Sequence, residues 1–262
     1  MTFKIGLNLG IKQIDICQFY QEIDKFVKNM SVNEKKKACA CVSCEFRDVV
    51  FKFLDDASIE ELCDNKDQQF FHKGEVINHE GEKITTFKYL QSGLVKLYRR
   101  TAAGEEQVIT ITRPFEFVSN MSIFSEEKYQ YSVSALEDSV VCTVRLDFIK
   151  DLFLRNGEFA MILLTKISMI NDKIINQTLD IRQKNLVGRV AYVLLYFTNE
   201  IYKSRVFDLP VSRKEIADYI GMSTANVIRT LSDFKKEGII RVFGKTIEIV
   251  DLEKLEIISK RG

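Results

Sequence analysis

The stretch VSRKEIADYIGMSTANVIRTLSDFKKEGIIRVFGKTIEI, residues 211–249, decides how the C-terminal part of the chain folds. Ser212 is followed three residues later by a glutamate, the capping box that begins a helix. Gly221 closes that helix in a tight turn, and Ser223 is the natural N-cap of a second helix. The runs IIRVF and TIEI, joined across a Gly-Lys pair, then predict a β-hairpin. Two short helices about a glycine turn, followed by a hairpin, are typical of a winged helix-turn-helix.

The second helix of this unit is the one that we expect to read DNA. Val227, Leu231 and Phe234 form its apolar face, so a turn of 100° per residue places Arg229 outward. An arginine can hold guanine O6 and N7 together, whereas serine and lysine suit phosphates. The predicted DNA contacts are Ser212, Lys214, Ser223, Thr224, Ala225, Asn226, Ile228, Arg229, Ser232, Lys236 and Lys245. The alternative is a helical hairpin that uses this periodicity only for its own core.

Residues 66–146 have a different texture, with short runs rich in β-branched and aromatic residues. Gly74, Gly81, Gly93 and Gly104 separate these runs, each beside a lysine, glutamate or serine. Short strands divided by glycine turns predict an all-β barrel or sandwich, in which the glycines supply the positive φ of the turns.

A long helical stretch is predicted at 147–181, where apolar residues recur at alternating spacings of three and four. Such a seam favours a partner helix from a second copy of the chain. The predicted dimer seam includes Leu163, Ile167, Ile170, Ile174 and Ile181. A second apolar stripe, expected to pack on the β-domain, comprises Met161, Leu164, Ile175 and Leu179. The alternative is that the seam itself packs on the β-domain.

The composition is that of a globular protein, 46% hydrophobic and 29% charged, with a net charge of +1. No apolar run approaches the ~18 residues that span a bilayer, and the first residues lack the apolar segment of a secretory signal. We therefore expect a cytoplasmic protein with no membrane partner, in which cysteines stay reduced. His72 and His79 stand alone, and no nucleophile–base pattern is present, so we expect no enzymatic activity.

A barrel, a long helix and a winged helix-turn-helix together resemble the Crp/Fnr family of bacterial transcription regulators. The resemblance covers residues 45–255, and its blocks include HKGEVINHEGE (72–82), YLQSGLVKLY (89–98), GEEQVITITRPFEFV (104–118) and SALEDSVVC (134–142). It implies an α+β protein with an N-terminal double-stranded β-helix (jelly-roll) sensor domain, a long dimerisation helix and a C-terminal winged helix-turn-helix. It also implies a homodimer that binds double-stranded DNA and acts on RNA polymerase.

The expected domains follow from this resemblance. They are an N-terminal extension with a cysteine cluster at 1–45, a sensor barrel at 46–148, a dimerisation helix at 149–183 and a DNA-binding domain at 184–262. A DNA-binding regulator that answers a redox, gas or small-molecule signal is the leading hypothesis. The competing hypothesis is a metal- or ligand-sensing module that binds no DNA and acts through protein contacts.

Two departures from the family's patterns bear on the signal and on the target. Cyclic-nucleotide binders of the family carry Gly-Glu-Leu and Arg-Ser/Thr-Ala motifs, where this chain has Ser119-Asn120-Met121 and an arginine-free loop, EEKYQYSVSA. A buried phosphate without a counter-charge is costly, so cyclic AMP is not the expected ligand. The oxygen sensors of the family carry Glu and Ser where this chain has Ala225 and Ile228. We therefore expect a different half-site, with guanine still opposite Arg229.

Three cysteines lie close together in the stretch KKKACACVSCEF: Cys39, Cys41 and Cys44. The resemblance to the oxygen-sensing branch implies a [4Fe–4S] cluster held by three N-terminal cysteines and one barrel cysteine, which matches Cys142. The third N-terminal ligand would fall at about Val50, so Cys39 must stand in for it. Four thiolates also suit zinc, and a redox-active thiol group or a different signal remain alternatives.

Overall fold

The structure, a computed structural model, describes residues 51, 54–119 and 122–261. The chain divides into two compact units, Met1–Ala40 and Cys41–Gly262, and the described residues all belong to the second. The predicted cysteine cluster at Cys39, Cys41 and Cys44 therefore lies outside the described residues. Within the described part, no helix combines the length and the apolar character needed to cross a membrane.

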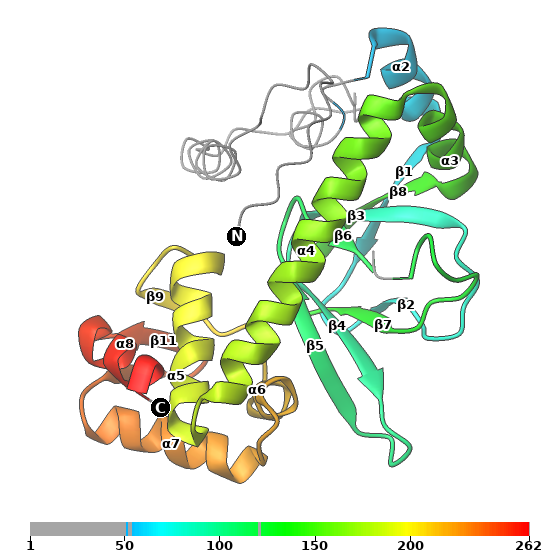
Figure 1. Ribbon diagram of the computed structural model, residues 1–262. Coiled ribbons are helices and arrows are strands. Elements are labelled where there is room, and N and C mark those ends of the chain that lie inside the picture. The colour runs from blue at the N-terminus through cyan, green and yellow to red at the C-terminus, as the bar shows by residue number, and fades with distance from the viewer. Residues whose placement is uncertain (1–50, 52–53, 120–121, 262) are drawn as a thin grey trace, which may run out of the picture. The chain divides into compact units, whose positions relative to one another are not determined.

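Two antiparallel sheets of four strands form the β-domain (Figure 1). The strands are β1 (Lys66–Phe71), β2 (Val76–Asn78), β3 (Thr86–Ser92), β4 (Val95–Arg100), β5 (Glu106–Thr112), β6 (Phe117–Val118), β7 (Ser132–Ala135) and β8 (Ser139–Arg145). One sheet has the order β1-β8-β3-β6 and the other β2-β7-β4-β5. Strands far apart in sequence, such as β1 and β8, are thus neighbours. The predicted jelly-roll domain is confirmed.

The turn glycines of the β-domain have the backbone conformation that the sequence predicts. Gly74, Gly81, Gly93 and Gly104 all have positive φ. At Gly93, between β3 and β4, a Cβ would also lie 2.5 Å from the carbonyl oxygen of Asp138. A larger residue there would therefore both strain the backbone and collide with the turn that precedes β8.

Alternate side chains of β3 belong to two different cores. Leu90 packs with Val141 and other apolar residues of both sheets. Phe87 and Tyr89 point the other way and belong to a cluster that the neighbouring helices complete. These helices are α2 (Asp56–Asp64), α3 (Leu146–Arg155) and α4 (Gly157–Gln183). The inner strand β8 is therefore buried on both faces, in keeping with its largely apolar sequence SVVCTV.

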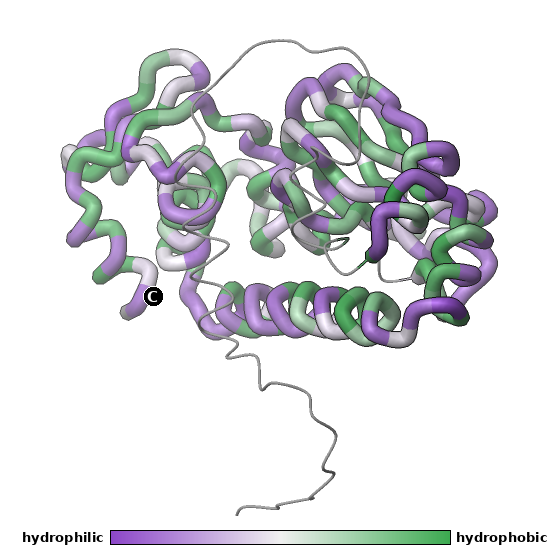
Figure 2. Tube along the Cα trace, turned by 90° about the horizontal axis from the view of Figure 1, so that it is seen from above, coloured by the Kyte–Doolittle hydropathy of each residue, from purple (hydrophilic) through white to green (hydrophobic). Residues whose placement is uncertain are grey.

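The long helix predicted at 147–181 is divided into α3 and α4. The break falls at Asn156, whose backbone is extended and whose side chain accepts a hydrogen bond from Phe159 N at 3.0 Å. An asparagine in this position is a strong N-cap, so the sequence ends one helix and begins the next. Figure 2 shows hydrophobic and hydrophilic residues alternating along α4.

The predicted dimer seam of α4 contacts the chain's own core. Leu163 is completely buried, and Ile167 and Ile170 pack against the same cluster as Phe87. Ile174 and Ile181 are also buried. Residues of the same chain thus cover most of this seam, which was expected to face a partner helix.

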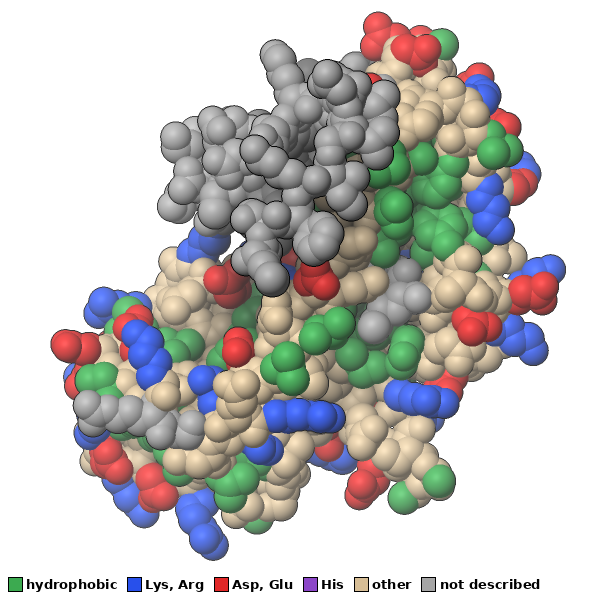
Figure 3. Space-filling view, in the orientation of Figure 1, with side chains coloured by type: hydrophobic (Ala, Val, Ile, Leu, Met, Phe, Trp, Pro, Cys, Tyr) green, Lys and Arg blue, Asp and Glu red, His purple; other side chains and the backbone are tan. Residues whose placement is uncertain are grey.

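The second apolar stripe of α4, predicted to pack on the β-domain, is instead exposed. Its four residues, called here the outer stripe, are exposed by 48% to 61% and are Met161, Leu164, Ile175 and Leu179. Figure 3 shows hydrophobic side chains gathered on the face of the molecule over which α4 runs. The exposure of the two faces of α4 is thus the reverse of what was predicted.

The C-terminal part contains the expected winged helix-turn-helix together with elements that the sequence did not predict. In chain order it comprises α5 (Leu186–Leu195), the π-helix η3 (Tyr196–Ile201), β9 (Val206–Asp208), α6 (Arg213–Ile220), α7 (Thr224–Lys236), β10 (Ile240–Phe243), β11 (Thr246–Ile249) and α8 (Leu252–Arg261). The wing is a three-stranded sheet of order β10-β11-β9. The π-helix and the terminal α8 are the additions.

Candidate nucleic-acid interface

The first helix of the motif, α6, begins with the predicted capping box. Ser212 Oγ accepts a hydrogen bond from Glu215 N at 3.1 Å, and Glu215 Oε2 accepts one from Ser212 N at 2.8 Å. The helix ends at Gly221, whose φ of 64° lies in the left-handed region. Helix α6 is therefore fixed at both ends by local sequence. Ser212 itself is exposed and keeps its hydroxyl proton for an acceptor such as a phosphate.

The second helix, α7, has the two faces that its sequence predicts. Ser223 caps it by accepting a hydrogen bond from Asn226 N at 3.3 Å. Val227, Leu231 and Phe234 are buried. The exposed residues of the predicted DNA-reading face are Ala225, Ile228, Arg229, Ser232 and Lys236, while Thr224 and Asn226 are half-buried.

The charges on this surface are not equally available to a partner. Arg229 makes no ion pair with any residue that the structure describes. Lys214 instead donates to Asp218 at 2.9 Å, one helical turn further on, and this hydrogen bond raises the pKa of the lysine. Lys236 is similarly placed, with its Nζ 3.7 Å from Asp233 Oδ1 on α7, but the charge of Lys214 is the more closely paired with a carboxylate of its own helix. A phosphate would have to compete with Asp218 for it.

The wing adds a basic and an apolar side chain beside the motif. Its tip is Gly244, with a φ of 61°, and Lys245, which is exposed as predicted. Phe243, next to them, is 64% exposed and was not predicted as a contact residue. Its place directly before the Gly-Lys turn could have indicated this exposure, because a hairpin tip has no core to cover it.

A small cavity lies between α4 and the β-domain, and both an acidic and a basic side chain line it. Its lining residues are Leu97, Thr110, Thr112, Glu116, Phe117, Ser119, Ile170, Lys173 and Ile174. Lys173 Nζ lies 2.9 Å from Glu116 Oε1, and Arg113 Nε lies 3.1 Å from the same oxygen. Burial opposes ionisation of Glu116, but these two cations lower the pKa of its carboxyl below the ordinary value. The cations near this cavity are therefore already neutralised.

Cys142 is the one predicted metal ligand among the described residues. It lies on β8, fully buried, with its Sγ 3.3 Å from Gln91 Oε1 and 3.6 Å from Gln68 Nε2. Tyr89, which pairs with Cys142 from β3, lies edge-on to the ring of Phe51, with 6.4 Å between the two ring centroids. Among the described residues, no three His, Cys, Asp or Glu side chains come together as a metal site. Cys142 does, however, face the side of the sheet at which the described chain begins.

In comparison with known proteins, two family models match, one the β-domain and the other the C-terminal part of the chain. Residues 68–156 match the model of the cyclic nucleotide-binding domain, and residues 188–258 match that of the Crp-like helix-turn-helix domain. Together the two matches span more than half of the chain.

Among curated proteins, the electron transport regulator A of Shewanella oneidensis is 24% identical over 88% of this chain and 96% of its own length. The anaerobic regulatory protein of Pasteurella multocida is 25% identical over 92% of this chain and 93% of its own length. Among solved structures, FixK2 from Bradyrhizobium japonicum shares the fold, with a TM-score of 0.67 and 22% identity over 74% of this chain and 96% of that one. The chain belongs to the Crp/Fnr family of transcription regulators.

Proposed function

We propose that this regulator is a homodimer that reads a palindromic DNA site with α7 and answers a signal other than cyclic AMP. The observation that carries the proposal is the exposed Arg229, which forms an ion pair with none of the described residues, on a helix whose opposite face is fixed in the core. Such an arginine can bind guanine O6 and N7 from the major groove. Two further exposed residues suit phosphates: Ser212 at the start of α6 and Lys245 on the wing.

The outer stripe of α4 supports the dimer. Its first and last residues, Met161 and Leu179, are separated by about 27 Å along the helix axis at 1.5 Å per residue. Burying one such aliphatic side chain stabilises a contact by roughly 1.5–3 kcal/mol. A second copy of α4, related by two-fold symmetry, would cover this stripe with the same residues. It would also set the distance between the two copies of α7, as a palindromic site requires.

The cavity between α4 and the β-domain supports a signal other than cyclic AMP. A cyclic phosphate bound there would lie near Glu116, whose lowered pKa keeps it ionised at neutral pH. Lys173 and Arg113 already pair with that carboxylate. Binding a second anion would therefore require these cations to leave Glu116 or to be shared with it, which disfavours a phosphate ligand.

The cysteines supply the second part of the proposed signal. Cys142 lies on the side of the sheet that Phe51 covers, and Cys44 precedes Phe51 by seven residues, at most about 25 Å of extended chain. This placement fits a [4Fe–4S] cluster held by Cys39, Cys41, Cys44 and Cys142, which would supply redox or gas sensitivity. Cys142 would need to lose its thiol proton, and Gln68 could then donate to the thiolate.

Iron and acid-labile sulfide analysis of protein purified without oxygen tests the cluster. We expect about four irons per chain and a visible absorbance that bleaches in air. Cys142→Ala should abolish both, whereas Cys63→Ala, on half-buried α2, should leave both unchanged. Zinc in place of iron, or no metal, would contradict the cluster and leave DNA binding as a separate question.

DNA reading implies an action in the cytoplasm on transcription by RNA polymerase, with no catalytic step of the protein's own. The experiment that tests it is selection of bound duplexes from a random pool, followed by affinity measurements over a range of salt concentrations. We expect a palindromic site with guanine in each half and an affinity that falls steeply as salt rises, because phosphate contacts release counterions. Failure to enrich any sequence, with no salt-dependent binding, would favour a sensing module that acts through protein contacts.

A further inference from the structure

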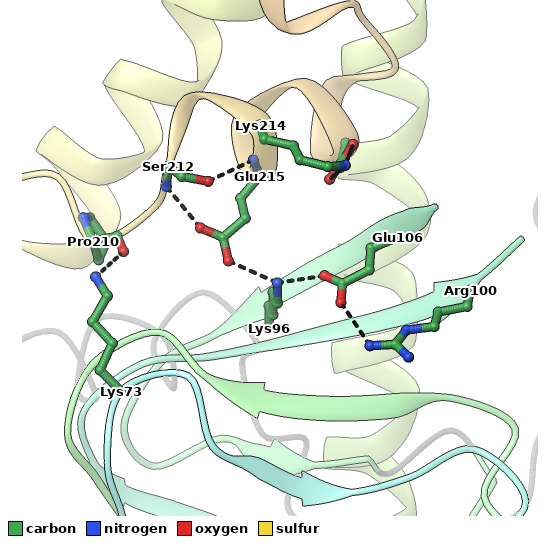
Figure 4. Close-up of polar contacts among 9 residues, drawn as sticks. Lys73, Lys96, Arg100, Glu106, Pro210, Ser212, Lys214 and Glu215 are labelled. Carbon is green, nitrogen blue, oxygen red and sulfur yellow. Dashed lines mark hydrogen bonds and ion pairs between the residues drawn. The ribbon is translucent and has the colours of Figure 1, made fainter. Parts of the chain in front are cut away.

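A buried lysine joins the β-domain to the first helix of the DNA-binding motif. Lys96 lies on β4, and only 7% of its surface is exposed. Its Nζ is 2.7 Å from Glu106 Oε2 on β5 and 2.8 Å from Glu215 Oε1 on α6. Figure 4 shows the ammonium between the two carboxylates. One side chain thus binds both its own sheet and a helix 119 residues further along the chain.

Both carboxylates have a second oxygen that extends this cluster in opposite directions. Glu106 Oε1 lies 3.5 Å from Arg100 Nη2, within the β-domain. Glu215 Oε2 accepts the hydrogen bond from Ser212 N that completes the capping box of α6. A continuous set of polar contacts therefore runs from the β-domain to the exposed serine that begins the DNA-binding motif.

The electrostatics make Lys96 and Glu215 depend on each other. Burial opposes both charges, but hydrogen bonds to Glu106 and Glu215 raise the pKa of Lys96, and the hydrogen bond from Lys96 lowers the pKa of Glu215. Both groups are therefore ionised at neutral pH. Removing one partner of such a pair leaves a charge that is partly buried and unpaired, which is more costly than losing the contact alone.

Other polar contacts between the two parts hold segments beside α6, not α6 itself. Lys73 Nζ donates to the carbonyl of Pro210 at 2.7 Å, and the hydroxyl of Tyr196 donates to the carbonyl of Ile111 at 3.1 Å. The hydroxyl of Tyr202 donates to Glu137. Among the described residues, Lys96–Glu215 is the only ion pair between α6 and the β-domain. It is thus the contact best placed to fix the direction of this helix.

We propose that Lys96 and Glu215 are positioning residues for DNA reading. Their ion pair holds α6 against the β-domain in one orientation, and α7 follows because the two helices share a core that includes Ile216, Ile220 and Val227. In a dimer, the orientation of each α7 sets which spacing of half-sites the protein accepts. This inference rests on the proposed function, since it assigns to the pair a role in the same DNA site.

Glu215→Gln and Glu106→Gln form a matched pair of variants. Each removes one carboxylate charge from Lys96 with almost no change in volume. A glutamine at position 215 can still complete the capping box, so α6 keeps its start. Only Glu215→Gln weakens the contact between the β-domain and α6. Glu106→Gln weakens a contact within the β-domain and keeps the ion pair between Lys96 and Glu215.

Affinity for the selected palindrome, and for versions with one or two base pairs inserted between the half-sites, is the measurement. We expect the affinity of Glu215→Gln for the palindrome to fall about tenfold, and this variant to discriminate less against the insertions. The affinity of Glu106→Gln should stay within about twofold of wild type. Binding to DNA without the site should be the same for all three proteins, which shows that the DNA-binding domain is folded.

Amide hydrogen exchange without DNA gives a second readout. Backbone amides of α6 should exchange faster in Glu215→Gln than in Glu106→Gln, because only the first variant loosens this helix. Equal exchange in the two variants, or an unchanged spacing preference in Glu215→Gln, would overturn the positioning role while leaving DNA reading intact. A chain that selects no DNA sequence would overturn the proposed function itself, whatever the exchange result.

Discussion

Helices α4 and α7 are both amphipathic, yet their faces differ in how far local sequence determines them. In α7 one apolar stripe contains Val227, Leu231 and Phe234, and the opposite face is polar apart from Ala225 and Ile228. That stripe is buried as predicted. In α4 two apolar stripes share the same period, and their burial in one chain is the reverse of that predicted. A single stripe identifies the buried side of a helix, whereas two stripes require knowledge of what each one meets.

Phe234→Ala in α7 should have the largest effect on stability. The ring is 2% exposed, and removing it leaves a cavity, so we expect the free energy of unfolding to fall by about 3–5 kcal/mol. Ser232→Ala, on the opposite face of the same helix, should change it by less than about 0.5 kcal/mol. Urea unfolding of both variants measures the difference. Similar losses in the two would mean that the faces of α7 are assigned wrongly.

Leu163→Ala and Leu164→Ala test the faces of α4 with the same substitution at neighbouring positions. Leu163 is completely buried, while Leu164 is 56% exposed in one chain. We expect Leu163→Ala to lower the free energy of unfolding by about 2–5 kcal/mol at every protein concentration. Leu164→Ala should instead lower the midpoint of unfolding only at concentrations where the wild-type chain is dimeric, because its loss falls on the dimer contact. The opposite pattern would restore the seam predicted from sequence.

Leu164→Glu combined with Ile175→Glu should separate the proposed dimer without unfolding the chain. Two carboxylates in each copy of the outer stripe would face those of the partner, so we expect monomers at micromolar concentration in sedimentation velocity. Leu154→Glu is the control, because Leu154 lies on α3, outside the stripe, and is 88% exposed. A double variant that still sediments as a dimer would show that another surface joins the copies.

The ion pair between α4 and the β-domain should give the smallest effect, and it depends on pH. Lys173 and Arg113 hold the pKa of Glu116 below its unfolded value, so the folded state gains stability above that unfolded value, about 4.3, and loses it as pH falls through the folded pKa. Glu116→Gln should therefore be less stable than wild type at pH 7 by about 1–3 kcal/mol, and the difference should shrink on acidification. A difference that is constant from pH 7 to pH 3 would contradict this pairing.

The parts of the structure that could be predicted are those that neighbouring residues determine. The capping box at Ser212, the left-handed Gly221 and the positive φ of the β-domain glycines all depend on a few adjacent positions. The pairing of Lys214 with Asp218 is also local, since the two are four residues apart, and it could have been predicted from the sequence.

The features that could not be predicted depend on residues distant in sequence. Nothing in the residues next to Lys96 points to Glu215, and only the fold brings the two together. The same holds for the inner face of α4, which is covered in part by β3 and α2, far upstream in the sequence. The exposed face of α7 could be predicted because helix geometry alone determines it, whereas the placement of α7 relative to the β-domain is a property of the whole chain.

Base reading by Arg229 is the central claim, and one measurement addresses it directly. Binding of wild type and Arg229→Ala should be compared on the selected palindrome and on every single-base variant of one half-site. We predict that Arg229→Ala loses about 1–3 kcal/mol of binding free energy on the palindrome and little on variants that lack the contacted guanine. Discrimination at that one base pair should therefore disappear. An equal loss on every variant would mean that Arg229 contacts phosphate, and would contradict the claim that this face of α7 reads sequence.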